Sequence, residues 1–283
     1  MNYQWYPGHM TKAKRMMQEN IGLIDLVIEL VDARVPMSSR NPDIDELGKN
    51  KSRIILLNKA DLADAGWNQK WTAYFQNRGL FVQEINSKTG AGIKGIQELV
   101  QAACKEKIER DRKRGILNRP VRAMVTGIPN VGKSTFINTL AGKACAKTGN
   151  KPGVTKGKQW IRLNKNLELL DTPGILWPRF ENQTVGERLA MIGSINDEIL
   201  HVDELAASII TFLQKEYAGA LDARYDIQAD EDAYQTLEKI CISKKCFQKG
   251  QQPDLLRAAG MVVEDFRSGR IGRITLEHPE EWQ

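Results

Sequence analysis

Several features that mark secreted, zinc-binding or membrane proteins are missing from this sequence of 283 residues. It has only 4 cysteines and 3 histidines, with no CxxC pair, so neither a disulfide framework nor a zinc site is indicated. No apolar run approaches the roughly 20 residues of a membrane-spanning helix. The first residues also lack the apolar core of a signal peptide. We therefore expect a cytoplasmic protein without a membrane partner.

Acidic residues are also scarce over the first part of the chain. Residues 1–180 hold 30 Lys and Arg but 16 Asp and Glu, a net charge of +14, whereas residues 181–283 have a net charge of −8. The acidic part nevertheless contains two basic clusters, which are Lys244, Lys245 and Lys249, and Arg267, Arg270 and Arg273. Charge of this kind suits contact with RNA phosphates, although solvated basic surfaces would give the same pattern.

Apolar runs alternate with helical patterns through residues 1–180. Six runs have the character of buried strands, and they lie at 25–34, 53–61, 79–90, 122–126, 158–163 and 166–174. Strands that alternate with helices indicate a parallel sheet covered on both faces. Beyond residue 180, one helical pattern follows another. We therefore predict a doubly wound, mostly parallel six-stranded α/β domain over residues 1–180, including an N-terminal segment, and a small all-α domain over residues 181–283.

The sequence GIPNVGKS at 127–134 matches the phosphate-loop pattern GxxxxGK[ST], and it stands between a predicted strand and a predicted helix. Such a loop turns backbone N–H groups toward phosphate oxygens at the positive end of the following helix. Lys133 is expected to reach the β- and γ-phosphates, and Ser134 to bind Mg²⁺. The expected nucleotide-binding residues of this loop are Gly127, Pro129, Asn130, Val131, Gly132, Lys133, Ser134 and Thr135.

Two further segments indicate contacts to magnesium and the γ-phosphate. DTPG at 171–174 closes a predicted strand, where Asp171 is expected to hold Mg²⁺ and the Gly174 N–H to sense the γ-phosphate. Between the two motifs, Thr155 in KPGVTK is the candidate switch threonine for Mg²⁺, with a simple Pro-Gly turn as the alternative. Lys133, Thr155 and Gly174 are the expected catalytic contacts to the γ-phosphate.

The sequence NKAD at 58–61 follows a predicted strand and has the pattern Asn-Lys-x-Asp, by which many GTP-binding proteins read guanine. Asn58 would contact the N7 or O6 edge of the base, and Lys59 would lie along its face. Asp61 would accept hydrogen bonds from N1–H and from the exocyclic amine of guanine. Because adenine offers no such pair of donors, Asp61 predicts selection of guanine.

The next predicted strand is followed by NSKTG at 86–90, which has the position of a second base loop. Ser87 and Lys88 would bind guanine there, Ser87 through its backbone N–H. The motif order is therefore guanine, guanine, phosphate, switch one and switch two. A conventional GTPase begins with the phosphate loop instead, but the same site results if the old termini are fused, here over residues 106–120, and the chain is cut after switch two. This order indicates a circularly permuted GTPase that binds GTP and GDP with Mg²⁺.

The cut places switch two directly before the helical domain. A shift of Gly174 that depends on the γ-phosphate would then pass along the chain into that domain. We therefore expect the arrangement of the two domains to differ between the GTP-bound and GDP-bound states.

Six segments spread over the chain closely resemble the bacterial ribosome biogenesis GTPase A family: WYPGHM at 5–10, DARVP at 32–36, NKAD at 58–61, GIPNVGKST at 127–135, PGVTKG at 152–157 and DTPGILWP at 171–178. The resemblance extends over essentially the whole chain. It implies a cytoplasmic GTPase that acts late in the maturation of the large ribosomal subunit. It also implies that the protein binds ribosomal RNA and that the subunit stimulates its GTP hydrolysis.

The residue that orients the attacking water is not evident. Conventional GTPases often place a glutamine just after the DxxG glycine, but here Ile175 and Leu176 follow, so slow hydrolysis by the protein alone is expected. His9 is a candidate because a side chain with a near-neutral pKa suits this task and because the resemblance favours it. A surface role for His9, and a group supplied by the ribosome, are the alternatives. Asn130 resembles an asparagine that helps related GTPases bind K⁺, with loop geometry alone as the alternative.

Two other interpretations fit parts of the sequence. A signalling GTPase with a protein partner and no RNA role would leave the basic first domain unexplained. A nucleotide-gated binding module with negligible turnover is consistent with Ile175. We expect a monomer that binds the large ribosomal subunit and its RNA.

Overall fold

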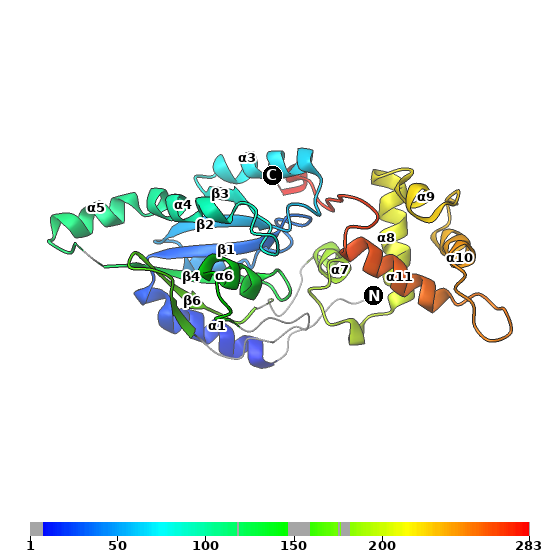
Figure 1. Cartoon of the computed structure of the whole chain (residues 1–283), viewed down its shortest axis with the longest axis horizontal. Coiled ribbons are helices and arrows are strands. Elements are labelled where there is room, and N and C mark those ends of the chain that lie inside the picture. Colours follow the sequence, from blue (N-terminus) through cyan, green and yellow to red (C-terminus); the bar gives the residue numbers. More distant parts are fainter. Residues whose placement is uncertain (1–7, 118, 147–158, 175, 177–181, 283) are drawn as a thin grey trace. The chain divides into compact units, whose positions relative to one another are not determined.

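The computed structural model describes residues 8–117, 119–146, 159–174, 176 and 182–282. These residues belong to two compact units (Figure 1). The first, here called the α/β unit, takes in the described residues up to 176 and also residues 275–282. The second, the helical unit, takes in residues 182–274. Within the described ranges, every helix is too short or too polar to cross a lipid bilayer.

A six-stranded sheet forms the centre of the α/β unit, in the order β3-β2-β1-β4-β6-β5. Its strands are β1 (Leu26–Asp32), β2 (Ser52–Asn58), β3 (Phe81–Glu84), β4 (Val121–Gly127), β5 (Gln159–Arg162) and β6 (Leu167–Asp171). Every neighbouring pair is parallel except β5 and β6, which are antiparallel. The predicted mostly parallel, six-stranded α/β fold is therefore confirmed.

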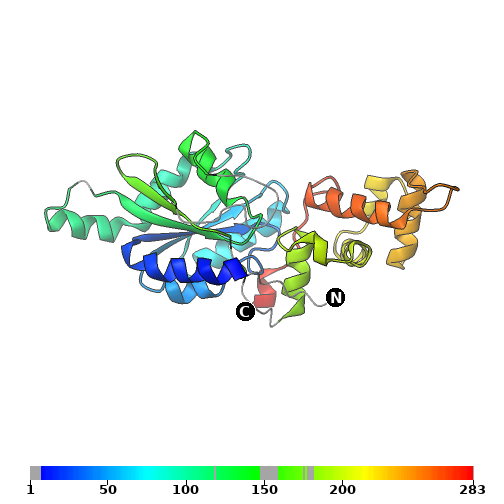
Figure 2. The same ribbon diagram turned by 90° about the horizontal axis from the view of Figure 1, so that it is seen from below.

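Helices cover both faces of this sheet. Figure 2 shows α1 (Gly8–Asn20) and α6 (Lys133–Ala141) on opposite sides of it. The other helices of four or more residues before β6 are α2 (Asp43–Leu47), α3 (Ala65–Gln76), α4 (Ile96–Ala103) and α5 (Lys105–Lys113). All 7 residues of β1 are buried, which explains why its sequence is a nearly continuous apolar run rather than an alternating one. The parallel strands also bring the loops after β1, β2, β3, β4 and β6 to one edge of the sheet.

The end of the chain returns to the α/β unit and packs against α3 and the loop after β1. The Leu276 N–H donates to the Arg34 carbonyl at 2.8 Å. The Trp71 indole N–H donates to the Glu277 carbonyl at 3.1 Å, and the His278 ring stacks on Trp67 with 3.7 Å between ring centroids. The sequence interpretation of residues 181–283 as one helical domain did not include this return, because no residue pattern in the last segment names its contacts.

The helical unit contains α7 (Gln183–Met191), α8 (Val202–Glu216), α9 (Ala220–Tyr225), α10 (Ala233–Ser243) and α11 (Leu255–Arg267). Leu205, Ile209 and Leu213 of α8 recur at helical spacing and are at most 1% exposed. In this unit, α8 packs against α11 and α10.

Two arginines of the predicted RNA-binding cluster at 267–273 serve the packing of the helical unit. Arg267 donates to the carbonyls of Ala190 and Met191 at the end of α7 and pairs with Asp197 at 2.7 Å. Arg270 pairs with Asp265, a carboxylate of α11 that is 1% exposed. Ion pairs within the unit therefore explain much of this cluster without an RNA.

We expect Asp265→Asn to destabilise the helical unit. The Asp265 carboxylate also accepts hydrogen bonds from Arg224 and from the Tyr225 hydroxyl, so its loss leaves several donors without their charged partner. Because the arginines stay partly exposed, we expect a cost of about 2 kcal/mol, below the usual value for a fully buried pair. Urea unfolding followed by circular dichroism measures it, with the exposed neighbour Glu264→Gln as the control; equal stability of the two variants would contradict the expectation.

Candidate nucleotide site

The phosphate loop connects β4 to α6 and requires a glycine at position 132, for two reasons: its backbone conformation and its closeness to Asn58. Gly132 has φ of +98°, a conformation that side chains rarely adopt. A Cβ atom at Gly132 would lie 2.5 Å from the Asn58 amide nitrogen. The loop can therefore keep this path only with glycine at 132. Asn130, whose φ is 59°, is also in the left-handed region.

Gly174 of the DTPG motif lies directly against the phosphate loop. A Cβ atom at Gly174 would be 3.0 Å from the Pro129 nitrogen and 3.1 Å from its Cα atom. The preceding Thr172 is fully buried and donates its hydroxyl proton to the Val125 carbonyl of β4 at 2.8 Å. The fold thus brings together two motifs that the sequence predicted to share one site.

Lys133 and Asp171 form an ion pair at the centre of this site. The Lys133 Nζ lies 3.2 Å from the Asp171 carboxylate, and the side chains are 6% and 1% exposed. Burial lowers the pKa of Lys133, and the charge of Asp171 only partly offsets this. A buried cation and a buried carboxylate placed beside a phosphate loop suit a phosphate and a metal ion, which would each attract one member of the pair.

The donor set suits Mg²⁺ brought in with a nucleotide. The described residues contain no group of three or more His, Cys, Asp and Glu side chains that could hold a metal alone. Mg²⁺ needs no such group, because it usually binds one or two protein ligands, phosphate oxygens and water. Asp171 and Ser134, at the start of α6, can supply the protein ligands.

Asn58 connects three loops at this edge of the sheet. Its amide nitrogen donates to the Val131 carbonyl of the phosphate loop at 2.7 Å. Its carbonyl oxygen accepts from the Ser87 N–H at 3.0 Å and from the Ser87 hydroxyl at 2.9 Å. Asn58 is 1% exposed. The Ser87 N–H that was expected to reach guanine is therefore engaged by Asn58, and one amide hydrogen of Asn58 remains for the base.

Two other predicted base contacts, Asp61 and Lys88, lie on exposed loops. Neither side chain makes a hydrogen bond or ion pair with another described residue, so both are open to a ligand. The Asn86 side chain shapes the second loop by accepting from the N–H groups of Lys88 at 2.9 Å and Thr89 at 3.0 Å. The Thr139 hydroxyl of α6 donates to the Ser87 carbonyl at 2.7 Å and joins this loop to the phosphate-loop helix.

Lys59 is held by a buried carboxylate that sequence reasoning did not assign to the site. Asp32, at the end of β1, is 0% exposed and lies 2.9 Å from the Lys59 Nζ. Arg34 binds the same carboxylate through two nitrogens at 2.9 and 2.8 Å. Burial alone would raise the pKa of Asp32, but the charges and hydrogen bonds of Arg34 and Lys59 hold it well below its usual range. In the sequence, DARVP at 32–36 was noted only for its family resemblance and was given no role in the site.

Glu277, in the returning end of the chain, binds the loop that follows Asp32 and Arg34. Its carboxylate is 0% exposed and accepts from the N–H groups of Met37 and Ser38 and from the Ser38 hydroxyl. The adjacent Ser39 hydroxyl accepts from the Asp32 N–H at 2.9 Å. Glu277 thus holds the loop that carries Asp32 and Arg34. No signal in the sequence connects a glutamate near residue 280 with a loop near residue 35.

Two predicted catalytic groups, the His9 side chain and Thr155, fall outside the described residues. The backbone of residue 9 lies in α1, but the His9 side chain is outside the described part. Thr155 and Ile175 are also outside it.

The site combines a phosphate loop, a buried lysine and carboxylate, and two loops suited to guanine, all at one edge of a doubly wound sheet. These features define a GTPase of the phosphate-loop class in which the guanine loops precede the phosphate loop.

Comparison with known proteins agrees with this class. The sequence model described as "50S ribosome-binding GTPase" matches residues 122–242. The chain is 46% identical to ribosome biogenesis GTPase A of Bacillus cereus, covering 100% of this chain and 96% of the relative. It is 32% identical to ribosome biogenesis GTPase A of Thermotoga maritima, covering 98% and 95%. The crystal structure of GNP-bound YlqF from T. maritima matches with a TM-score of 0.66 and 28% identity over 95% of this chain and 99% of that chain.

The chain belongs to the ribosome biogenesis GTPase A family, which confirms the resemblance found in its motifs.

We expect Gly132→Ala to lower the affinity for GDP by at least about a hundredfold, because the new methyl group would displace the Asn58 amide and open the phosphate loop. Gly142→Ala is a matched control, since Gly142 also has a positive φ, of 65°, but has nothing within 4 Å of a Cβ atom. Isothermal titration with GDP measures both variants. Similar losses in the two would show that backbone strain, and not the Asn58 contact, decides binding.

We expect Glu277→Gln to raise the dissociation constants of GDP and GTP about tenfold, because weaker charge-assisted hydrogen bonds to Ser38 loosen the loop that holds Lys59. The hydrolysis rate at saturating GTP should stay within about twofold of that of the unchanged protein, since Glu277 acts on the guanine loop and not on the residues of the phosphate loop. The exposed Glu280→Gln is the control. A variant that unfolds at lower temperature yet binds both nucleotides normally would reduce Glu277 to a stabilising role.

Proposed function

We propose that this protein is a GTP-hydrolysing assembly factor of the large (50S) ribosomal subunit that contacts ribosomal RNA in the cytoplasm. The observation that carries this proposal is the 46% identity to B. cereus ribosome biogenesis GTPase A over the whole chain, which includes both units. The match to the model described as "50S ribosome-binding GTPase" supports the large subunit as partner. The net charge of +14 over residues 1–180 supports contact with RNA.

Guanine recognition rests on the two base loops. The exposed Asp61 carboxylate accepts from N1–H and the exocyclic amine of guanine, and the remaining amide hydrogen of Asn58 donates to the N7 and O6 edge. The aliphatic part of Lys59, whose Nζ is held by Asp32, lies along the face of the base. Lys88 covers the opposite side of the pocket.

The phosphates and Mg²⁺ bind at the phosphate loop. Backbone N–H groups of residues 130–135 surround the phosphates, and Lys133 leaves Asp171 to neutralise the β- and γ-phosphates. Asp171, Ser134 and Thr155 hold Mg²⁺, which supplies positive charge against the charge that develops during phosphoryl transfer. Asn130 contributes to a K⁺ site beside the same phosphates.

The γ-phosphate state passes to the helical unit through the chain. Gly174 lies against Pro129 of the phosphate loop, and the helical unit begins only a few residues later. A γ-phosphate bonded to the Gly174 N–H therefore changes the path of the connecting segment and with it the arrangement of the two units. Small-angle scattering curves that coincide in the GTP-bound and GDP-bound states would contradict this.

Because residues 175 and 176 are Ile and Leu, water must be oriented by another group, and His9 performs this role when the subunit is bound. We expect purified 50S subunits to raise the GTP hydrolysis rate at least tenfold in K⁺ buffer and much less in Na⁺ buffer. His9→Ala should lose most of the stimulation and retain GDP binding, as measured by phosphate release and by titration.

The same assay separates the rival functions. Stimulation by 50S subunits that is unchanged in His9→Ala would place the orienting group on the ribosome. Failure to sediment with 50S subunits in either nucleotide state would favour a signalling GTPase. Binding without any turnover would indicate a nucleotide-gated binding module.

A further inference from the structure

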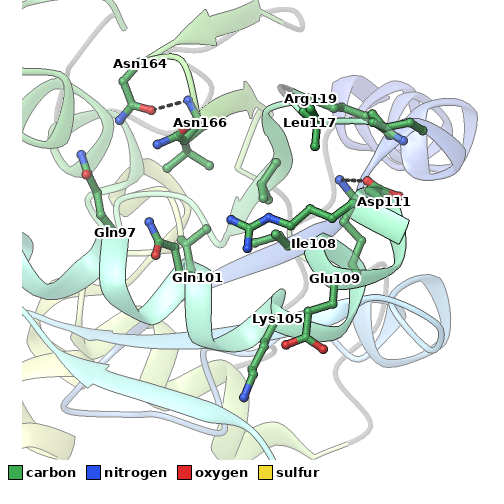
Figure 3. Close-up of a pocket in the computed structure, with 16 residues that line it drawn as sticks. Gln97, Gln101, Lys105, Ile108, Glu109, Asp111, Leu117, Arg119, Asn164 and Asn166 are labelled. Atoms are coloured by element: carbon green, nitrogen blue, oxygen red, sulfur yellow. Dashed lines mark hydrogen bonds and ion pairs between the residues drawn. The ribbon is translucent and has the colours of Figure 1, made fainter. Parts of the chain in front are cut away.

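A cavity of about 350 Å³ lies in the α/β unit at the end of the sheet opposite the nucleotide loops (Figure 3). Val121 and Leu167, which begin β4 and β6, line it, whereas the phosphate loop and Asp171 are at the other ends of these strands. Its other walls come from α4, α5, the segment after α5 and the turn between β5 and β6. Much of this wall is the segment that joins the guanine half of the chain to the phosphate half. GTP binding as described above uses none of it.

The wall formed by α5 is fixed to the sheet by buried ion pairs. The Lys107 Nζ lies 2.8 Å from the Asp111 carboxylate and 3.3 Å from that of Asp25, just before β1. Arg119, which follows α5, lies 3.3 Å from Asp25. The side chains of Lys107, Asp111 and Asp25 are only about one-tenth exposed. The cavity is therefore preformed, because its charged helix cannot swing away without breaking these pairs.

Three kinds of group surround the cavity: aliphatic side chains, side-chain amides and charged side chains. Aliphatic side chains, among them Val100, Ile108 and Leu167, provide apolar surface. Side-chain amides come from α4 and the β5–β6 turn, and those of Gln97, Gln101 and Asn166 make no hydrogen bond to another described residue. Figure 3 shows these amides together on one side of the cavity, with Leu117 and Arg119 on another.

The charge at the rim is mainly positive. Lys105 and Arg112 line the cavity and have no ion pair with any described residue, so their charges are available to a ligand. Two acidic side chains also line it, but Lys107 neutralises Asp111, which leaves Glu109 as the single acidic group opposed to these cations.

We propose that this cavity binds an unpaired nucleotide of a single-stranded RNA segment. The base lies against the aliphatic surface and the Arg112 guanidinium, and the amides of Gln101 and Asn166 bond its edges. The flanking phosphates lie on Lys105 and Arg112. Unpaired bases that are held by their edges and stacked on guanidinium planes are the usual way in which proteins read single-stranded RNA.

RNA fits the cavity better than an acidic peptide does, because RNA uses all three kinds of group at once. An unpaired base presents donors and acceptors in a plane, as the amides do, beside a flat apolar face and a regularly spaced charge. The net charge of +14 over residues 1–180 extends the attraction to phosphates beyond the cavity. The assignment rests on the proposed function only for the source of the RNA, which would be an unpaired segment of the ribosomal RNA.

Two arginines of α5 provide a matched test. Arg112 lines the cavity, whereas Arg110 is on the same exposed helix, has the same charge and does not line it. Fluorescence anisotropy of the full-length protein with labelled single-stranded RNA of about eight nucleotides measures binding. We expect Arg112→Ala to weaken binding about tenfold and Arg110→Ala no more than about twofold. Asn166→Ala should weaken binding as well, without the change in salt dependence that Arg112→Ala causes.

The possible results separate this proposal from the proposed function. Equal losses in Arg110→Ala and Arg112→Ala would show general attraction to a basic helix and overturn the cavity. Tighter binding of an RNA duplex of the same length would also overturn it. If Arg112→Ala sediments with 50S subunits as the unchanged protein does, and RNA binding is unaffected, the cavity is not an RNA site although the assembly role stands. If Arg112→Ala loses binding to RNA-free ribosomal proteins but keeps its binding to RNA, the ligand of the cavity is a protein instead.

Discussion

The nucleotide site depends on the hydrogen bonds of one buried side chain, that of Asn58. Its amide donates to the phosphate loop at Val131 and accepts twice from Ser87 of the second base loop. Only a side chain with both a donor and an acceptor on one short planar group can do this. An aspartate at 58 would face the Val131 carbonyl with a second acceptor, and an apolar residue would leave several buried groups without partners. The same amide explains why residue 132 is glycine, because it occupies the space that a Cβ atom at this position would need.

This interaction also explains why the order of the motifs in the chain does not matter to the site. Asn58 follows β2, Ser87 follows β3 and Val131 follows β4, and these strands are parallel within one sheet. Their carboxyl ends therefore meet at one edge whichever strand comes first. The connection between the two halves of the chain runs through α5 into Val121, at the opposite edge of the sheet from the nucleotide loops. The cavity beside α5 lies at this same edge.

The residues with local signatures were predictable from the sequence. A phosphate loop, DTPG and NKAD each have a pattern that reflects backbone geometry or side-chain chemistry within a few residues, and the structure brings their described residues to one edge. The central strands β1, β2 and β4 were predictable because buried parallel strands are continuous apolar runs. The Glu277–Ser38 contact was not, since a buried acidic residue has no pattern until the partner loop is placed beside it. Arg267 and Arg270 looked like RNA contacts because a sequence shows charge but not the Asp197 and Asp265 that pair with them.

The return of residues 275–282 gives the helical unit two covalent connections to the α/β unit. One leaves the α/β unit after Gly174, which lies against the phosphate loop. The other re-enters at Thr275, whose hydroxyl accepts from the Asp64 N–H, in the segment just after NKAD. Two residues later, Glu277 holds the loop that carries Asp32 and so positions Lys59. The helical unit is therefore joined in the chain to both parts of the nucleotide site, through Gly174 beside the phosphate loop and through Thr275 and Glu277 beside the guanine loop.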